Sequence, residues 1–205
     1  MMRKLSSALI SKKSINFLMF KRLFDISLSF LLIILFALPM LLISILIKFS
    51  SPGGILFWSK RVGKNNALFS MPKFRSMSIN TPVIATHQLN NPQEHITRLG
   101  EVLRRFSIDE LPQLFSIFLG DMSFVGPRPA LYNQHDLIAL RDKYGVSKIK
   151  PGLTGWAQIN GRDSLSIKQK VEFDVYYLTR MSIILDIKII LFTFVKVYTS
   201  KNISH

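Results

Sequence analysis

The chain has 205 residues, of which 48% are hydrophobic and 19% are charged. This length suits one ordinary domain with an appendage, and the apolar fraction argues against intrinsic disorder. Cysteine is absent, which excludes disulfide frameworks, thiolate metal sites and cysteine nucleophiles. The net charge of +15 predicts an anionic partner, such as nucleic acid, an acidic membrane surface or a phosphorylated substrate.

The positive charge is concentrated in the first 80 residues, which hold twelve Lys or Arg against a single acid, Asp25. These bases flank residues 26–47, a run of 22 residues without a formal charge. As a helix this run is about 33 Å long, enough for the ~30 Å hydrocarbon core of a bilayer. We therefore expect a basic N-terminal segment over 1–22, a membrane helix over 23–48 and a cytosolic domain over 49–205.

Basic residues on both sides of the apolar run bear on how it sits in the membrane. Positive charge next to a membrane helix marks the cytoplasmic side, so a simple crossing leaves one basic cluster on the wrong face. Pro39 lies within the run, and an internal proline removes a helix hydrogen bond and bends the helix. The pattern favours a bent, re-entrant helix that enters and leaves by the cytoplasmic face. A straight span with a modest kink is the alternative.

The remainder of the chain predicts a small α+β domain that is mostly helical. Short apolar runs around the turn signals PGG and GKNN predict a hairpin within 50–77, and the polar, proline-containing stretch 78–93 predicts a surface loop. Helices are expected over 94–106, 109–119, 130–143, 165–178 and 182–198, with a turn at 120–129 and a glycine-rich loop at 150–162. The last helix is amphipathic, which fits either a helix in the membrane interface or a helix packed on the core.

Two adjacent acids, Asp109 and Glu110, are the most informative candidates for chemistry. They precede Pro112, which is tolerated in the first turn of a helix, and they follow Arg104 and Arg105 in sequence. We expect both carboxylates to stay ionised there. The sequence Ser-Ile-Asp-Glu also matches a helix capping box. A carboxylate pair is equally what phosphoryl transfer needs, one group to attack phosphorus and one to hold Mg²⁺; the two readings are compatible.

Several basic residues lie in segments whose backbone can approach or fix an anion. Arg128 stands between two prolines, which restrict the backbone that carries its guanidinium. The glycine-rich loop has Lys150 at one end and Arg162 at the other, and it fits a phosphate-binding loop or an ordinary structural loop. Lys73 and Arg75 supply further cations. An enzyme that acts on a membrane-borne diphosphate would need this set of groups.

These motifs together resemble a known family, the bacterial polyprenyl-phosphate phosphoglycosyl transferases, in its short monotopic form. The resemblance covers residues 21–198, nearly the whole chain. It is carried, in chain order, by KRLFD (21–25), SPGG and RVG within 51–63, KFRSM (73–77), SIDELPQL (107–114), GDMSFVGPRP (120–129), KPGLTGWAQINGR (150–162) and D-x-x-Y (174–177).

The resemblance implies transfer of a sugar 1-phosphate from a UDP-sugar to undecaprenyl phosphate, with release of UMP. Asp109 would be the nucleophile and form a phosphosugar-aspartyl intermediate, Glu110 would coordinate Mg²⁺, Arg128 would bind phosphate, and Arg104 would support the carboxylates. The expected location is the cytoplasmic face of the bacterial inner membrane, where the basic residues meet anionic lipids. The similarity to short members favours an N-acetylated amino sugar, with galactose or glucose as alternatives.

A second hypothesis is a non-catalytic, membrane-anchored module whose basic face binds anionic lipid or a partner protein, with the acid pair only capping a helix. Nucleic acid is not expected as a partner, because the bases cluster beside a hydrophobic anchor and are not interleaved with aromatics in a groove-like pattern. Loss of UMP release on replacing Asp109 would separate the first hypothesis from the second.

Overall fold

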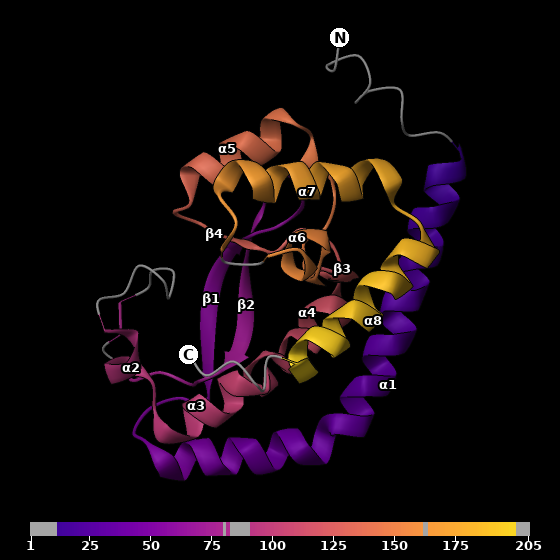
Figure 1. Ribbon diagram of the computed structural model, residues 1–205. Helices are drawn as coiled ribbons and strands as arrows, with labels where there is room; N and C mark the ends of the chain where they lie inside the picture. The colour runs from indigo at the N-terminus through magenta and orange to yellow at the C-terminus, as the bar shows by residue number, and fades with distance from the viewer. Residues whose placement is uncertain (1–11, 80, 83–90, 162–163, 200–205) are drawn as a thin grey trace.

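A computed structural model describes residues 12–79, 81–82, 91–161 and 164–199. Its longest element is α1 (Lys12–Ser50), which contains Pro39 and extends beyond the expected membrane segment at both ends. Figure 1 shows that α1 is bent: its indigo part runs down one side of the domain and its purple part turns beneath it. Among the described residues, the stretch Asn16–Ser50 is the one helical segment long and apolar enough to cross a membrane. The expected apolar helix is therefore present.

Both ends of the apolar stretch pack on the same domain. Near its start, Lys21 and Asp25 are buried, and Asp25 accepts hydrogen bonds from the Ser123 hydroxyl and the Phe124 amide. Near its end, Ile47 is buried in a cluster that includes Phe74. Between these ends lies a series of exposed large apolar side chains, among them Phe30, Leu31, Ile34, Leu35, Leu38, Leu41, Leu42, Ile45 and Leu46.

The expected hairpin is confirmed as β1 (Leu56–Val62) and β2 (Leu68–Phe74), which pair antiparallel and place Phe57 opposite Lys73. A short 3₁₀ turn, η2 (Lys64–Asn66), joins them, and both of its asparagines have positive φ, a conformation that asparagine tolerates well. A third strand, β4 (Ala130–Leu131), pairs with the other edge of β1. The expectation of a helix over 130–143 is thus wrong at its start, and α5 (His135–Lys143) supplies its helical part.

A second, parallel sheet joins two segments that the sequence predicts as a turn and a loop. It pairs β3 (Ser123–Val125) with β5 (Gly152–Thr154), and the Gly126 amide extends the pairing by donating to the Thr154 carbonyl at 2.9 Å. Helix α6 (Trp156–Ile159) follows directly. The glycine-rich motif is therefore a buried strand and a helical turn in its described part.

The remaining described helices differ from the expected ones mainly in where they begin. The expected helix 94–106 is split into α2 (Pro92–His95) and α3 (Arg98–Arg105), because Thr97 adopts an extended conformation and caps α3 by accepting from the Gly100 amide. The expected helix 109–119 is a 3₁₀ turn, η4 (Ile108–Glu110), followed by α4 (Gln113–Leu119). Another 3₁₀ turn, η5 (Val146–Lys148), precedes β5.

The last two helices confirm the expectations for 165–178 and 182–198. Helix α7 (Ile167–Arg180) begins with a complete capping box between Ser166 and Gln169. Helix α8 (Ile183–Thr199) buries Asp186 and Ile189 while Ile184 is 81% exposed. One face of α8 enters the core, as the core-packed reading predicts, and its other face is exposed and apolar.

Candidate active site

The acid pair lies on η4, a turn held in place by apolar neighbours on both sides. Ile108 and Leu111 pack against the cluster that contains Phe74 and Leu103, so the two acids between them lie close to β2. Asp109 is 8% exposed. The sequence of this turn does not form a capping box: Ser107 is in the left-handed conformation with φ 55° and makes no side-chain capping bond. The capping reading is therefore wrong for Ser107.

Two of the predicted cations meet Glu110 directly. Lys73 Nζ lies 2.6 Å from Glu110 Oε1, and Arg128 Nη2 lies 3.5 Å from the same oxygen. Lys73 comes from β2, Arg128 comes from the segment between β3 and β4, and the acids come from η4. The structure therefore brings Lys73, which lies 37 positions before Glu110, and Arg128, which follows Glu110 in the chain, to one carboxylate pair.

The electrostatic environment of Asp109 is balanced between burial and nearby charge. Burial raises the pKa of Asp109 above its ordinary range, and Glu110 adds to the rise, while Lys73, Arg104 and Arg128 oppose it. Arg104 therefore belongs to the same electrostatic cluster as the acid pair. The sequence analysis expected nearby charge to keep Asp109 ionised; desolvation, the largest contribution, acts against ionisation, and the three cations act for it.

Arg61 is a member of this cluster that the sequence reasoning did not select. Its guanidinium donates to the Ser59 hydroxyl at 2.9 Å and to the Pro129 carbonyl at 3.0 Å. Burial and the nearby Arg128 together lower the pKa of Arg61 to about 10 against the opposing effect of Glu110, so Arg61 stays a cation at neutral pH. The signal was available, since strand alternation places position 61 on the same face of the hairpin as Lys73.

The other predicted cations do not join the acid pair. Arg75 donates to the carbonyls of Ser51 and Pro52 at 2.8 and 2.7 Å and thereby fixes the loop that follows α1. Lys150 lies near Arg22: burial lowers its pKa, and Arg22 is the next cause. Arg162 lies outside the described residues. Pro39 belongs to α1.

Mg²⁺ is the metal that the resemblance implies, and carboxylate oxygens are the protein groups that could bind it here. The described residues contain no group of three or more His, Cys, Asp or Glu side chains that could form a protein-only cage. Asp109 and Glu110 are two adjacent carboxylates on one turn. Mg²⁺ is usually held by one or two carboxylates together with substrate phosphates and water. The residues present therefore fit a Mg²⁺ ion that binds together with a diphosphate substrate.

Comparison with known proteins places the chain in a family. Residues 16–200 match the model of the bacterial sugar transferases. The chain is 39% identical over 190 residues to the UDP-glucose:undecaprenyl-phosphate glucose-1-phosphate transferase of Escherichia coli (88% of this chain, 40% of that protein). It is 36% identical over 183 residues to the uncharacterized sugar transferase EpsL of Bacillus subtilis (89% of each chain). It is 37% identical over 175 residues to the UDP-N-acetylgalactosamine-undecaprenyl-phosphate N-acetylgalactosaminephosphotransferase of Aeromonas hydrophila (83% and 41%).

The chain therefore belongs to the bacterial sugar transferase family. The chain spans about two fifths of the length of several curated relatives, as in the Escherichia coli protein. It spans most of the length of EpsL. The family resemblance seen in the motifs is confirmed.

Proposed function

We propose that this protein transfers a sugar 1-phosphate from a UDP-sugar to undecaprenyl phosphate and releases UMP. The observation that carries the proposal is the acid pair on η4 with Lys73 and Arg128 at Glu110, on a domain packed against both ends of an apolar helix. The names of the relatives support the two substrates, since the Escherichia coli and Aeromonas hydrophila proteins are named for UDP-sugars and undecaprenyl phosphate.

The chemistry follows from a buried carboxylate beside cations. A carboxylate oxygen of Asp109 attacks the phosphorus that bears the sugar, forms an acyl phosphate and breaks the phosphoanhydride bond, and UMP leaves with the bonding electron pair. An oxygen of undecaprenyl phosphate then attacks the same phosphorus, forms a new phosphoanhydride and releases the Asp109 carboxylate. Lys73, Arg104 and Arg128 favour the ionised state of Asp109 and offer positive charge to the phosphates. When bound, Mg²⁺ would neutralise charge on the donor diphosphate, with Glu110 as its protein ligand.

We also propose that the apolar helix is re-entrant and that the domain stays on one face of the membrane. The support is that residues at both ends of the apolar stretch pack on one domain: Asp25 with Ser123, and Ile47 with Phe74. A helix whose two ends contact the same extramembrane domain must return to the face it came from. The bend in Figure 1 agrees with this, and Pro39 is its proposed cause. Anionic lipids of the cytoplasmic leaflet would hold the basic residues around the helix.

The first experiment measures UMP release by the detergent-purified protein with UDP-sugars, Mg²⁺ and undecaprenyl phosphate. We expect release by the wild-type protein, complete loss on chelation with EDTA, and recovery when Mg²⁺ is restored. Asp109→Asn should abolish release, and Asp136→Asn, an exposed carboxylate on α5, should leave it unchanged. Radiolabel from the β-phosphate of the donor should stay on the wild-type protein in the absence of acceptor and be absent from Asp109→Asn. Full activity of Asp109→Asn would remove the assigned nucleophile.

The sugar is the least constrained part of the proposal. An N-acetylated amino sugar is our first candidate, and glucose is the sugar named for the Escherichia coli relative. A panel of UDP-N-acetylglucosamine, UDP-N-acetylgalactosamine, UDP-glucose and UDP-galactose, compared by kcat/KM for UMP release, decides between them. A tenfold preference for a hexose without an amino group would overturn our first choice and leave the reaction class intact.

The topology has its own test, which the absence of cysteine simplifies. Single-cysteine variants at the exposed positions Asn16 and Lys64 flank the bend on either side. In intact cells we expect that a membrane-impermeant maleimide labels neither, and that both react after the cells are lysed. Labelling of one position from outside would show that the helix crosses the membrane.

A further inference from the structure

The segment that carries Arg128 is held by three consecutive backbone carbonyls. The Pro127 carbonyl accepts from the Gly152 amide at 2.9 Å. The carbonyl of Arg128 itself accepts from Arg141 Nη1 at 2.8 Å, and the Pro129 carbonyl accepts from Arg61 Nη1 at 3.0 Å. Since the two prolines also restrict φ, little freedom is left in the backbone from which the Arg128 side chain extends.

Arg141 is in turn fixed by a buried carboxylate on another helix. Its Nε and Nη2 lie 2.9 and 2.7 Å from Asp174 Oδ2, and the Asp174 side chain is 2% exposed. The planar guanidinium therefore uses one edge for Asp174 on α7 and its remaining nitrogen for the Arg128 carbonyl. A lysine cannot reproduce this arrangement, because its ammonium is a single centre without a fixed planar fork.

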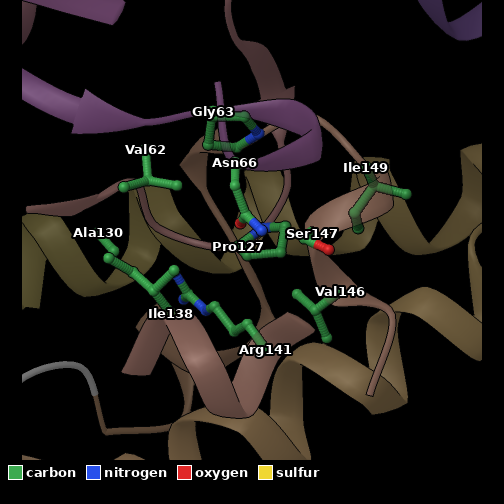
Figure 2. A pocket seen from close by; sticks show the side chains of 11 residues that line it. Val62, Gly63, Asn66, Pro127, Ala130, Ile138, Arg141, Val146, Ser147 and Ile149 are labelled. Atoms are coloured by element: carbon green, nitrogen blue, oxygen red, sulfur yellow. The ribbon is translucent and has the colours of Figure 1, made fainter. Parts of the chain in front are cut away.

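The same segment also borders a small cavity among the described residues. Figure 2 shows Pro127 and Ala130 lining a small cavity together with Arg141 from α5. With about 30 Å³ of space, this cavity holds about one water molecule. Arg128 does not line this cavity, and its Nη2 lies 3.5 Å from Glu110 Oε1.

We propose that Arg141 and Asp174 are positioning residues of the transferase: through the Arg128 carbonyl they set where the Arg128 guanidinium stands relative to Glu110 and the donor diphosphate. This inference rests on the proposed function. Neither residue contacts the reacting atoms. Burial of an ion pair is by itself a weak source of stability, whereas an error of about 1 Å in the placement of a group that binds the transition state can cost about 100-fold in rate.

The double-displacement course of the reaction makes the inference testable without confusion with folding. In such a mechanism kcat/KM for the UDP-sugar reports the donor half-reaction, and kcat/KM for undecaprenyl phosphate reports the acceptor half-reaction. Because Arg128 is assigned to the donor phosphates, Arg141→Lys and Asp174→Asn should lower the donor value about 10- to 100-fold and change the acceptor value less than twofold. A loss of folded protein would lower both values by the same factor, and that result would overturn the inference.

A second arm asks whether Arg141 acts through Arg128. In an Arg128→Lys background, which keeps some activity for measurement, adding Arg141→Lys should reduce the donor kcat/KM less than twofold further. Effects that multiply fully would contradict the proposed coupling. Lys168→Gln, an exposed cation on α7, serves as the matched control and should behave as wild type in both backgrounds.

A third arm does not depend on the enzyme activity. Hydrogen exchange of peptides that cover residues 124–131 should be at least tenfold faster in Arg141→Lys than in wild type, with no change for residues 56–60. Unchanged exchange at 124–131 would show that Arg141 does not hold this backbone segment, whatever reaction the protein catalyses. The wild-type protein could release UMP from no UDP-sugar while exchange at 124–131 is still faster in Arg141→Lys. In that case the proposed function fails, and the role of Arg141 in holding this backbone segment is supported.

Discussion

Replacing Lys21 by methionine is expected to weaken the contact between α1 and α8. Lys21 Nζ lies 2.5 Å from Asp186 Oδ2, and both side chains are at least nine-tenths buried. The second Asp186 oxygen accepts from the Tyr177 hydroxyl at 2.7 Å. Without Lys21, Asp186 keeps this neutral donor and loses its charge partner.

The size of the effect follows from burial. Removing one partner of a buried ion pair costs about 3–5 kcal/mol, because the other charge stays buried and uncompensated. In a chain of 150–250 residues 1 kcal/mol corresponds to about 2–4 °C, so Tm should fall by roughly 6–20 °C. Burial already raises the pKa of Asp186, and Lys21 is the first influence that opposes the rise. The variant carboxyl therefore takes up a proton more readily, which limits the cost at low pH.

The sign of the pH dependence is fixed by the direction of that shift. Because the folded-state pKa of Asp186 lies above the unfolded value, protonation favours the folded state, and stability falls as pH rises through the folded pKa. Loss of Lys21 raises the pKa of Asp186 and widens the pH range over which stability falls. The Tm difference between wild type and Lys21→Met should therefore be larger at pH 8 than at pH 5.

Thermal unfolding in detergent by intrinsic fluorescence measures these differences. Lys48→Met removes an exposed cation from the same helix and should change Tm by less than 2 °C. The double variant Lys21→Met/Asp186→Asn should be more stable than the sum of the two single losses predicts, because it buries neither charge alone. If Lys21→Met matches Lys48→Met at both pH values, the reasoning about the buried pair is refuted.

Two further predictions concern local backbone geometry and use the same assay. Thr97→Ala should cost about 1 kcal/mol, because Thr97 caps α3, whereas Ser107→Gly should be neutral or stabilising, since Ser107 has φ 55° and no capping bond; a larger loss at Ser107 would restore the capping box. Gly155→Ala should cost about 1–3 kcal/mol, because a Cβ there would lie 2.1 Å from the Gly126 carbonyl oxygen, while Gly54→Ala, with its nearest atom at 3.5 Å, should cost less than Gly155→Ala; equal losses would contradict the packing of these two loops.

The sequence predicted best those elements that local signals determine. The hairpin was recognised because β-favouring runs flank a turn whose asparagines adopt positive φ. The apolar helix was recognised from its length, and α7 begins at a complete capping box. By contrast, β3, β4 and β5 have three residues or fewer each. Their pairing partners are distant in sequence, so neither alternation nor turn signals could reveal them.

The acid pair illustrates how a local reading finds two neighbouring acids and does not reveal their burial. The adjacent carboxylates before Pro112 pointed to Asp109 and Glu110, and the structure places both beside Lys73. The predicted capping box does not form because α4 begins at Gln113, after the proline. The two acids therefore lie on a 3₁₀ turn that precedes this helix. The burial of Asp109 comes from tertiary packing of the turn. The number of arginines nearby in the sequence gives no information about this packing.

Two of the predicted cations, Arg75 and Lys150, lie away from the acid pair, because a sequence does not show which group each cation contacts. Several arginines of the described chain donate hydrogen bonds to backbone carbonyls. Arg22 donates to those of Ile117 and Phe118, Arg61 to that of Pro129, Arg75 to those of Ser51 and Pro52, and Arg141 to that of Arg128. Such a guanidinium satisfies carbonyls that a loop or a helix end would otherwise leave unpaired. An arginine bound in this way is not available to bind phosphate. The net charge of +15 therefore overstates the positive charge available to lipid and substrate. The cations that distinguish this site are Lys73 and Arg128, which contact Glu110, while Arg61 and Arg141 hold the backbone on either side of the Arg128 side chain.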